Sequence, residues 1–335
     1  MRVEVLDAAT DYVKITTNTT KRYASDTTLR VEFVRKNVLH RTDGPAVVEI
    51  DENGTAILEE YLVDGMHHRD GGLPAVVRRS HQRRVTEGGP VDAYTVIEQA
   101  WFYCGHLHRD DDLPAIVSRP GLGHVQLEWY TRGNKHRPAG GPAEIDVNRA
   151  IGTAADLVGV TVHLTYTNEA GKEHSTDDHP SHVVGTMVIP STDFDDDAAI
   201  ARITSEHLTV TERRWMRDGV AHRDGGPVWV RGSAYDWKRD GQFYRTDGPC
   251  KYTPGWGNGP GKAEYCFRDG PSPNPTSLTT VREHAREMYP TLRRSAAFAL
   301  YEMDRGLEPG LLSSSVTPDG QPDFSGTKRK RKKRY

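Results

Sequence analysis

The stretch His40-Arg41-Thr42-Asp43-Gly44-Pro45 decides the fold, because variants of it recur along most of the chain. Most copies follow an aromatic residue in the order aromatic, three residues, Gly, two residues, His-Arg. The equivalent positions are His40, His68, His108, His136, His174, His222 and Tyr244. Intervals of 22 to 48 residues between copies are typical of stacked supersecondary units. We call one aromatic residue with its following His-Arg corner a module.

Within a module the pattern is that of β-structure. The run Ala46-Val47-Val48-Glu49-Ile50 leads into Asn53-Gly54, and a second apolar run leads back out to Tyr61. Asn-Gly between two such runs predicts a hairpin with a type I′ turn, because both residues tolerate a positive φ. The Pro of each Asp-Gly-Pro corner cannot donate to a ladder and so ends a strand. Each module therefore predicts a hairpin followed by a tight corner.

The composition agrees with a thin, turn-rich array. Only 36% of the 335 residues are hydrophobic, while the chain has 32 Gly and 20 Pro. A single large core is normally richer in aliphatic residues, whereas a stack of hairpins tolerates this polarity. We expect one aromatic ring per module to form the core, each ring stacked on the next. The predicted fold is mainly β: an elongated solenoid of stacked antiparallel hairpins with a C-terminal helical cap.

The repeated His-Arg pairs allow two interpretations. They could form an anion-binding array, since Arg suits phosphate and carboxylate groups. Alternatively, Arg and Asp of one corner pair with each other while His packs on the aromatic ring. Repetition favours the structural interpretation, because a residue present in almost every module serves what every module needs. The residues assigned to this structural role are Trp101, Trp129, Trp215, Trp237, His40, Arg41, His68, Arg69, His108, Arg109, His222 and Arg223.

The fourth copy differs, because Pro138-Ala139 stands where the others have Asp. Arg137 is therefore expected to lack a local partner and to be available for an anion.

The repeated string resembles a divergent branch of the MORN repeats found in bacteriophage and large DNA-virus proteins. The resemblance covers about residues 31–270 and rests on the aromatic and Gly positions such as Trp101 with Gly105 and Trp215 with Gly219. It implies stacked antiparallel hairpins used for scaffolding, protein contact or lipid contact. The Gly-x-Gly opening of the family is replaced here by Asp-Gly-Pro. The resemblance implies no enzymatic motif.

The chain divides into four expected parts. Residues 1–30 alternate as capping strands, and residues 31–276 form the hairpin array with an irregular insertion at about 146–210. Residues 277–306 change to a helical period and predict a helical cap, with a partner-binding amphipathic helix as the alternative. Residues 307–335 form a disorder-prone basic tail. Within the insertion, the acidic run from Asp193 to Asp197 is expected at the start of a short helix.

Neither a disulfide framework nor a metal or other cofactor site is predicted. Cys104, Cys250 and Cys266 are odd in number and have no C-x-x-C spacing, which fits a reduced protein. The His-rich stretch from His174 to His182 matches no standard zinc signature. We interpret it as a degenerate copy of the repeated corner on a solvated surface. The pair His106 and His108 is a weaker candidate chelate. A metal ligand set is therefore not assigned.

The C-terminal tail is strongly cationic. Without its seven consecutive cations the formal charge of the chain changes from −3 to −10. Such a run binds phosphate backbones or acidic surfaces by charge and does not read bases. Together with Arg137, the expected anion or nucleic-acid contacts are Lys328, Arg329, Lys330, Arg331, Lys332, Lys333 and Arg334.

The leading hypothesis is a non-enzymatic scaffold that presents its repeats to a protein partner within a phage or viral assembly. A nucleic-acid-associated protein anchored by the tail is the first alternative, and an enzyme with its site in residues 146–210 is the second. No apolar segment follows Met1 and no run is long enough to span a membrane, which predicts a cytoplasmic or virion-associated protein that no signal peptide directs to secretion. The oligomeric state is left open.

Overall fold

The computed structural model describes residues 2–7, 11–19, 27–86, 89–121, 123–150, 156–245, 250–254, 262–265 and 276–277. The described residues are mainly β and form antiparallel sheet, as expected. They divide into two compact units. Unit 1 comprises residues 1–172 and 184–210, and unit 2 comprises residues 173–183 and 211–335. The expected helical cap, the linker before it and the basic tail lie outside the described residues.

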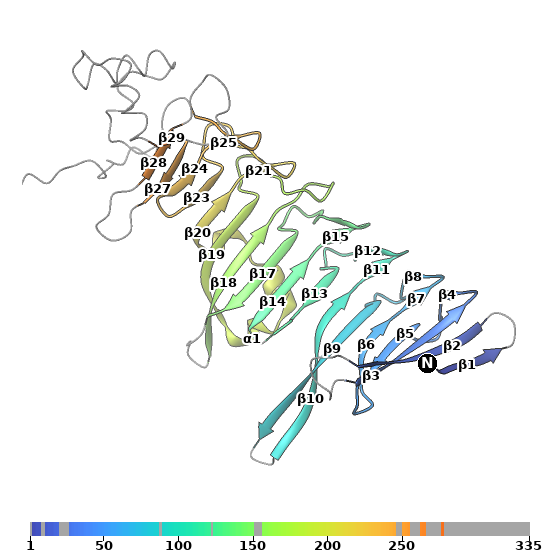
Figure 1. Ribbon diagram of the computed structural model, residues 1–335. Coiled ribbons are helices and arrows are strands. Elements are labelled where there is room, and N and C mark those ends of the chain that lie inside the picture. Colours follow the sequence, from blue (N-terminus) through green and yellow to red (C-terminus); the bar gives the residue numbers. More distant parts are fainter. Residues whose placement is uncertain are drawn as a thin grey trace, which may run out of the picture. The chain divides into compact units, whose positions relative to one another are not determined.

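Unit 1 is built on a sheet of long strands that pair in chain order, interrupted only by short hairpins (Figure 1). These strands are β1 (Arg2–Asp7), β2 (Asp11–Thr19), β3 (Thr27–Arg35), β5 (Val47–Ile50), β6 (Ala56–Glu60), β9 (Val76–Thr86), β10 (Gly89–Ala100), β13 (Ile116–Ser118), β14 (His124–Glu128), β17 (Glu144–Arg149) and β18 (Leu157–Thr165). Every neighbouring pair is antiparallel, so the chain moves steadily across the sheet.

Short hairpins sit at one end of these strands, one for each module (Figure 1). In unit 1 they involve β4 (Val38–Leu39), which pairs with β3, then β7 (Leu62–Val63) with β8 (Met66–His67), β11 (Phe102–Tyr103) with β12 (His106–Leu107), and β15 (Tyr130–Thr131) with β16 (Asn134–Lys135). The Gly N–H of each hairpin turn donates to a carbonyl of the preceding hairpin. Gly105 donates to His67 at 3.1 Å, and Gly133 donates to Leu107 at 2.9 Å. The hairpins thus form a second ladder beside the long strands.

Unit 2 repeats this plan. Its sheet strands are β23 (Trp229–Arg231), β24 (Ala234–Asp236), β27 (Lys251–Thr253), β28 (Lys262–Tyr265) and β29 (Thr276–Ser277), and its hairpins pair β21 (Met216–Arg217) with β22 (Val220–Ala221) and β25 (Lys238–Arg239) with β26 (Gln242–Phe243). Two strands contribute to both units, β19 (His182–Pro190) and β20 (Thr209–Arg214). Residues Glu212 to Arg214 of β20 pair with β23.

Short helices fill part of the stretch that the sequence suggested was irregular. They are α1 (Ser191–Phe194), α2 (Asp197–Ala201) and the 3-10 turn η1 (Ser205–His207). Asp196 caps α2 by accepting the Ala198 N–H at 2.8 Å, which confirms that the acidic run begins a short helix. Phe194 and Ile200 are buried. Among the described residues no helix is long and apolar enough to cross a membrane.

The core of unit 1 is largely aliphatic, and many of its fully buried residues lie on one face of β14, β17 and β18. Alternate residues of these strands are fully buried, including Val125, Leu127, Ile145, Val147, Val160 and Leu164. Since successive side chains point to opposite faces, the alternation leaves a second, polar face on the same strands. The aromatic rings add to the core at the strand ends, but they do not form all of it as the composition suggested.

The turns show which glycines the backbone requires. At Asn53-Gly54 only Gly54 has a positive φ, and its N–H donates to the Asp51 carbonyl. The predicted hairpin is confirmed there, but the predicted type I′ turn is wrong. Both central residues have positive φ at the module turns instead, as in Asp64-Gly65. The I′ geometry therefore belongs to the short hairpins, whose twist it matches.

Replacing Gly65 with Ala is expected to lower the free energy of unfolding by about 1–2 kcal/mol. Gly65 has a φ of 79°, and a Cβ there would lie 2.8 Å from Val38 Cγ1. Gly121→Ala is the matched control, since a Cβ at Gly121 meets nothing within 4 Å and its φ is not positive. Urea unfolding of the two variants measures the difference. Equal stability of both variants would contradict a strained turn at Gly65.

Candidate functional site

Every module closes with the same two backbone hydrogen bonds around its aromatic residue. The Trp129 N–H donates to the Ala143 carbonyl at 2.8 Å, and the His136 N–H donates to the Trp129 carbonyl at 3.0 Å. Equivalent pairs of bonds occur at Phe33, Tyr61, Trp101, Trp215 and Trp237. The ring is thereby fixed where a long strand passes into a short hairpin. Trp129 is only 2% exposed.

The Arg of each corner lies over the ring of its own module. The distance from the guanidinium carbon to the ring centroid is 4.0 Å for Arg41 on Phe33, 3.8 Å for Arg69 on Tyr61, 3.7 Å for Arg109 on Trp101, 4.2 Å for Arg137 on Trp129, 3.8 Å for Arg223 on Trp215 and 4.1 Å for Arg245 on Trp237. Arg109 also donates to the Pro114 carbonyl at 3.2 Å. Each Arg therefore holds its corner over its ring by a cation–π contact and hydrogen bonds.

This geometry supports a structural role for the pairs but corrects the roles within them. We expected Arg to pair with Asp and His to pack on the ring. Among the corners whose Asp is described, only Arg41 with Asp43 shows the expected pairing. In three corners it is His that meets the Asp, with His68 on Asp70 and His108 on Asp110 at 3.1 Å, and His222 on Asp224 at 3.3 Å. The exchange follows from shape, because a planar guanidinium covers a ring face and still donates at its edge.

Rings of successive modules do not stack on one another among the described residues, contrary to our expectation. The link between modules is instead a hydrogen bond from the indole edge. Trp101 Nε1 donates to the Gly72 carbonyl, Trp129 Nε1 to the Asp112 carbonyl and Trp215 Nε1 to the Asp178 carbonyl, each at 2.9 Å. The corner of one module thus rests against the ring of the following one.

His side chains provide a second link between modules. His40 Nδ1 accepts the Asp64 N–H at 3.0 Å. In unit 2, His222 Nδ1 lies 2.7 Å from Asp240 Oδ1 and 3.3 Å from the Asp240 N–H. Both contacts join a corner to the Asp-Gly turn of the next module. The repeated His side chains are therefore part of the fold.

Arg137 has an acidic partner although its own corner carries no Asp. Its guanidinium makes a two-pronged pair with Asp112, at 3.0 Å from Nε and 2.7 Å from Nη2, and donates to the Ala201 carbonyl. The expectation of a free Arg137 is wrong, because the carboxylate comes from the preceding corner, 25 residues earlier in the chain. Its side chain is 13% exposed. The reason for assigning Arg137 to anion binding is thereby removed.

The histidines considered as metal ligands have other contacts. His174 lies 3.2 Å from Asp218 Oδ1, and His179 Nδ1 lies 2.9 Å from the Pro180 carbonyl. Across the described ranges no group of three His, Cys, Asp or Glu side chains is placed to hold a metal ion. Cys250 is fully buried and disulfide-bonded, which corrects the expectation of reduced cysteines, whereas Cys104 is free and exposed.

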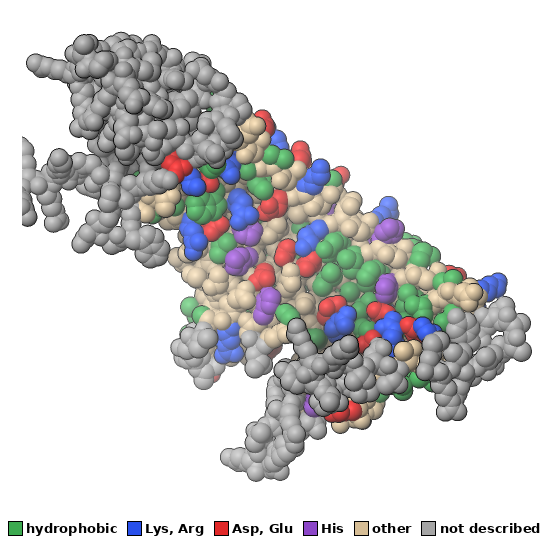
Figure 2. Space-filling view, in the orientation of Figure 1, with side chains coloured by type: hydrophobic (Ala, Val, Ile, Leu, Met, Phe, Trp, Pro, Cys, Tyr) green, Lys and Arg blue, Asp and Glu red, His purple; other side chains and the backbone are tan. Residues whose placement is uncertain are grey.

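The polar face of the unit 1 sheet carries ion pairs between strands, and Figure 2 shows acidic, basic and His side chains intermixed on the face in view. Lys135 Nζ lies 2.7 Å from Glu128 and 2.9 Å from Glu144. Burial opposes the charge of Lys135, but the hydrogen bonds to both carboxylates outweigh it and raise the pKa of its ammonium group. Burial raises the pKa of Tyr130 to about 12, with a contribution from its hydrogen bond to Glu128. These contacts join Tyr130 and Lys135 of hairpin β15–β16 to Glu128 and Glu144 of the sheet.

Asp178 gives the protein a pH-dependent contribution to stability. The hydrogen bond from Arg223 holds the pKa of the Asp178 carboxyl below its usual value. The stabilisation is therefore complete above the unfolded pKa of about 3.9 and is lost as the pH falls through the lower folded pKa. We expect Asp178→Asn to cost less than about 1 kcal/mol at neutral pH, since the carboxylate is largely exposed and such pairs are screened. Unfolding from pH 5 to pH 2 measures this. The difference from wild type should shrink toward pH 2, and a constant difference would contradict it.

The surface left over by the modules is the outward side of the unit 1 hairpins with their corners, which we call the outer rim. Its exposed apolar side chains are Val38, Met66, Leu73, Tyr103 and Leu113. Val63 and Met66 share one side of their hairpin, as do Tyr103 and His106. The Tyr103 ring contacts both His68 and His108, at 6.4 and 6.1 Å between centroids. The apolar side chains of the hairpins therefore adjoin the corners.

The outer rim is also acidic. Asp43, Asp70 and Asp110 are at least 80% exposed, while the Arg side chains of the same corners lie inward over their rings. A pocket of about 360 Å³ separates the first two corners, and its lining combines Asp43 and Asp70 with Arg41, His68 and Arg69.

Comparison of the chain with protein-family models, curated proteins and solved structures finds no match. The resemblance to MORN repeats therefore remains a prediction from the sequence. Sequence reasoning placed the repeated residues in the fold, but it missed the outer rim. The residue after each turn Gly could have indicated this surface, because its polarity differs between hairpins. It is apolar at Met66 and Val220 and polar at His106 and Asn134.

Proposed function

We propose that this protein is a non-enzymatic scaffold that binds a basic, partly apolar segment of a partner protein along the outer rim. The proposal rests on a difference between two sets of side chains within the modules: one set holds the fold together and the other is exposed. The repeated Arg and His side chains are engaged in the fold, whereas Met66, Leu73 and Tyr103 are half or more exposed beside accessible carboxylates. A contiguous apolar surface with charged neighbours is typical of a protein interface.

The wider architecture belongs to the same proposal. Modules that each bond to the next would stack as an elongated solenoid, with residues 277–306 as its helical cap. A long array offers one contact per module, so weak contacts add up over the partner. The resemblance to repeats of phage and viral proteins suggests an assembly of that kind.

The test compares partners retained by the full chain and by two variants. Met66→Asp combined with Tyr103→Asp disrupts the apolar part of the rim. The control Asn134→Asp introduces a charge at the position equivalent to Met66 in hairpin β15–β16, which carries no exposed large hydrophobic side chain. Quantitative mass spectrometry of crosslinked partners in native extract should show a protein depleted at least tenfold by the rim variant and retained by the control. Equal recovery on wild type and rim variant would refute the proposal, provided circular dichroism shows unchanged β-structure. Recovery only of this chain itself would mean that the rim binds a second copy and would refute a separate partner.

The cationic tail supports a second candidate, nucleic-acid association. Seven consecutive cations at residues 328–334 predict a slope of about −5 to −6 for the logarithm of the binding constant against that of salt concentration. Deletion of residues 328–335 should abolish binding to DNA or RNA. Binding that is absent, or independent of salt, would eliminate this candidate.

A further inference from the structure

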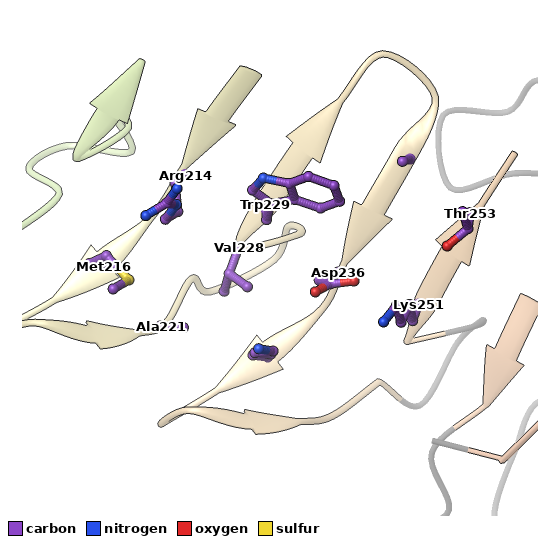
Figure 3. A pocket seen from close by; sticks show the side chains of 10 residues that line it. Arg214, Met216, Ala221, Val228, Trp229, Asp236, Lys251 and Thr253 are labelled. Atoms are coloured by element: carbon purple, nitrogen blue, oxygen red, sulfur yellow. The ribbon is translucent and has the colours of Figure 1, made fainter. Parts of the chain in front are cut away.

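A pocket of about 540 Å³ lies on the sheet of unit 2, beneath the hairpin β21–β22 (Figure 3). Four of its lining residues occupy one row across neighbouring strands. Arg214 faces Trp229, Trp229 faces Asp236, and Asp236 faces Lys251. These side chains therefore point to the same side of the sheet, and Figure 3 shows them arranged side by side. The pocket is within the size range of small-molecule sites.

The hollow arises from small residues in the hairpin above it. In unit 1 the corresponding hairpin carries Tyr130 and Lys135 as a pair, and both reach down to the sheet carboxylates. In unit 2 that pair is Met216 and Ala221. The methyl group of Ala221 cannot fill the space that a long side chain fills in unit 1. The sheet residues below are left to face an open volume.

Asp236 is an unsatisfied group in this pocket. Its Oδ1 atom is buried and has no hydrogen-bond partner among the described residues, and burial raises the pKa of its carboxyl against the opposing effect of Lys251 and Lys238. A buried polar atom without a partner calls for a specific explanation. A ligand that brings N–H donors to the carboxylate would satisfy it.

The remaining lining residues define what else the ligand must carry. Trp229 offers an indole whose orientation is fixed, since its Nε1 donates to Glu212 at 2.8 Å. Such a ring provides a stacking surface for a planar group. Arg214 stands on one side of Trp229 and Asp236 on the other. They are about 10 Å apart, as two strand spacings imply, so an anionic group and a donor edge can be bound at opposite ends of a planar ring.

We propose that this pocket binds a guanine nucleotide, with the base on Trp229, its Watson–Crick edge at Asp236 and its phosphate at Arg214. Guanine presents two adjacent N–H donors, which match the two oxygens of a carboxylate, and beside them a carbonyl that Lys251 can donate to. Adenine and cytosine place an acceptor next to their single amino group, and uracil has one N–H between two carbonyls. Guanine is therefore the base that fits this row of side chains. The site is separate from the outer rim and does not depend on the proposed scaffold function.

Calorimetric titration of the full chain with guanosine, inosine, adenosine and xanthosine monophosphates tests the proposal. The guanosine nucleotide should bind at least tenfold more tightly than the inosine nucleotide, which lacks one of the two donors, and than the adenosine nucleotide. Asp236→Asn should weaken guanosine monophosphate binding at least tenfold and make xanthosine monophosphate the better ligand, because an amide donates where a carboxylate accepts. Trp229→Ala should also weaken binding at least tenfold.

Arg231→Ala is the matched control, since it removes a cation from the same strand as Trp229 but outside the pocket lining. Its affinity should equal that of wild type. Failure of the guanosine nucleotide to bind at millimolar concentration, or unchanged binding by Asp236→Asn, would overturn the proposal. A uridine-rich single-stranded RNA with one guanine tests whether the bound guanine belongs to a free nucleotide or to unpaired RNA. Binding that depends on Asp236 and is over tenfold tighter than for the mononucleotide identifies unpaired RNA, and otherwise the free nucleotide is the ligand.

Discussion

Trp129→Ala is expected to lower the free energy of unfolding by about 3–5 kcal/mol, the range for removal of a large buried aromatic side chain. The ring is almost fully buried, it carries the guanidinium of Arg137, and its Nε1 bonds to the preceding corner. The substitution therefore removes core volume, removes the ring beneath Arg137 and leaves the Asp112 carbonyl without its Nε1–H donor. Urea unfolding followed by circular dichroism measures the effect.

Tyr103→Ala provides the control for this prediction. Tyr103 is also aromatic and lies in unit 1, but it is 58% exposed and is not the ring of a module. We expect a loss of less than about 1 kcal/mol, as for most surface substitutions. Comparable losses for the two variants would mean that the module rings have no special part in stability.

Lys135→Met is expected to cost about 2–4 kcal/mol, slightly less than removal of one partner from a fully buried ion pair. The substitution leaves Glu128 and Glu144 facing each other without a cation, at side-chain exposures of 13% and 24%. Repulsion and desolvation then both oppose folding. Thermal or urea unfolding at pH 7 measures the loss.

The neutral triple variant is the control for this effect. Adding Glu128→Gln and Glu144→Gln to Lys135→Met removes the uncompensated charges and should restore more than half of the lost stability. If the triple variant is no more stable than Lys135→Met alone, the loss comes from packing and the electrostatic account is incorrect.

The repeated string was sufficient to predict the antiparallel hairpins, because its turns and apolar runs are local features. The contacts within a module were less predictable. The partner of Arg137 comes from the previous corner, so a search within its own corner could not find it. The choice of Arg over His as the ring partner depends on the path of the corner, since Arg109 also has to reach the Pro114 carbonyl. Sequence spacing does not contain that path.

The unit 2 pocket could not be predicted for a related reason. Arg214, Trp229, Asp236 and Lys251 share no motif and become neighbours only through strand register. The sequence gives only a weak indication that Asp236 belongs to a recurring position. The residue before the module ring is acidic at Glu32, Glu60, Glu128 and Asp236. Only the paired strands show that Asp236 Oδ1 has no hydrogen-bond partner among the described residues, whereas Glu128 is paired with Lys135.

The central claim is that the repeated Arg and aromatic residues stabilise the fold as a pair. A double-mutant cycle on Arg109 and Trp101 tests it most directly, because that guanidinium lies 3.7 Å from the ring centroid. Unfolding free energies of wild type, Arg109→Met, Trp101→Leu and the double variant give the coupling. We expect the two residues to be coupled by about 1–2 kcal/mol, as for a desolvated cation–π contact. Additive losses, with no coupling beyond experimental error, would contradict the claim.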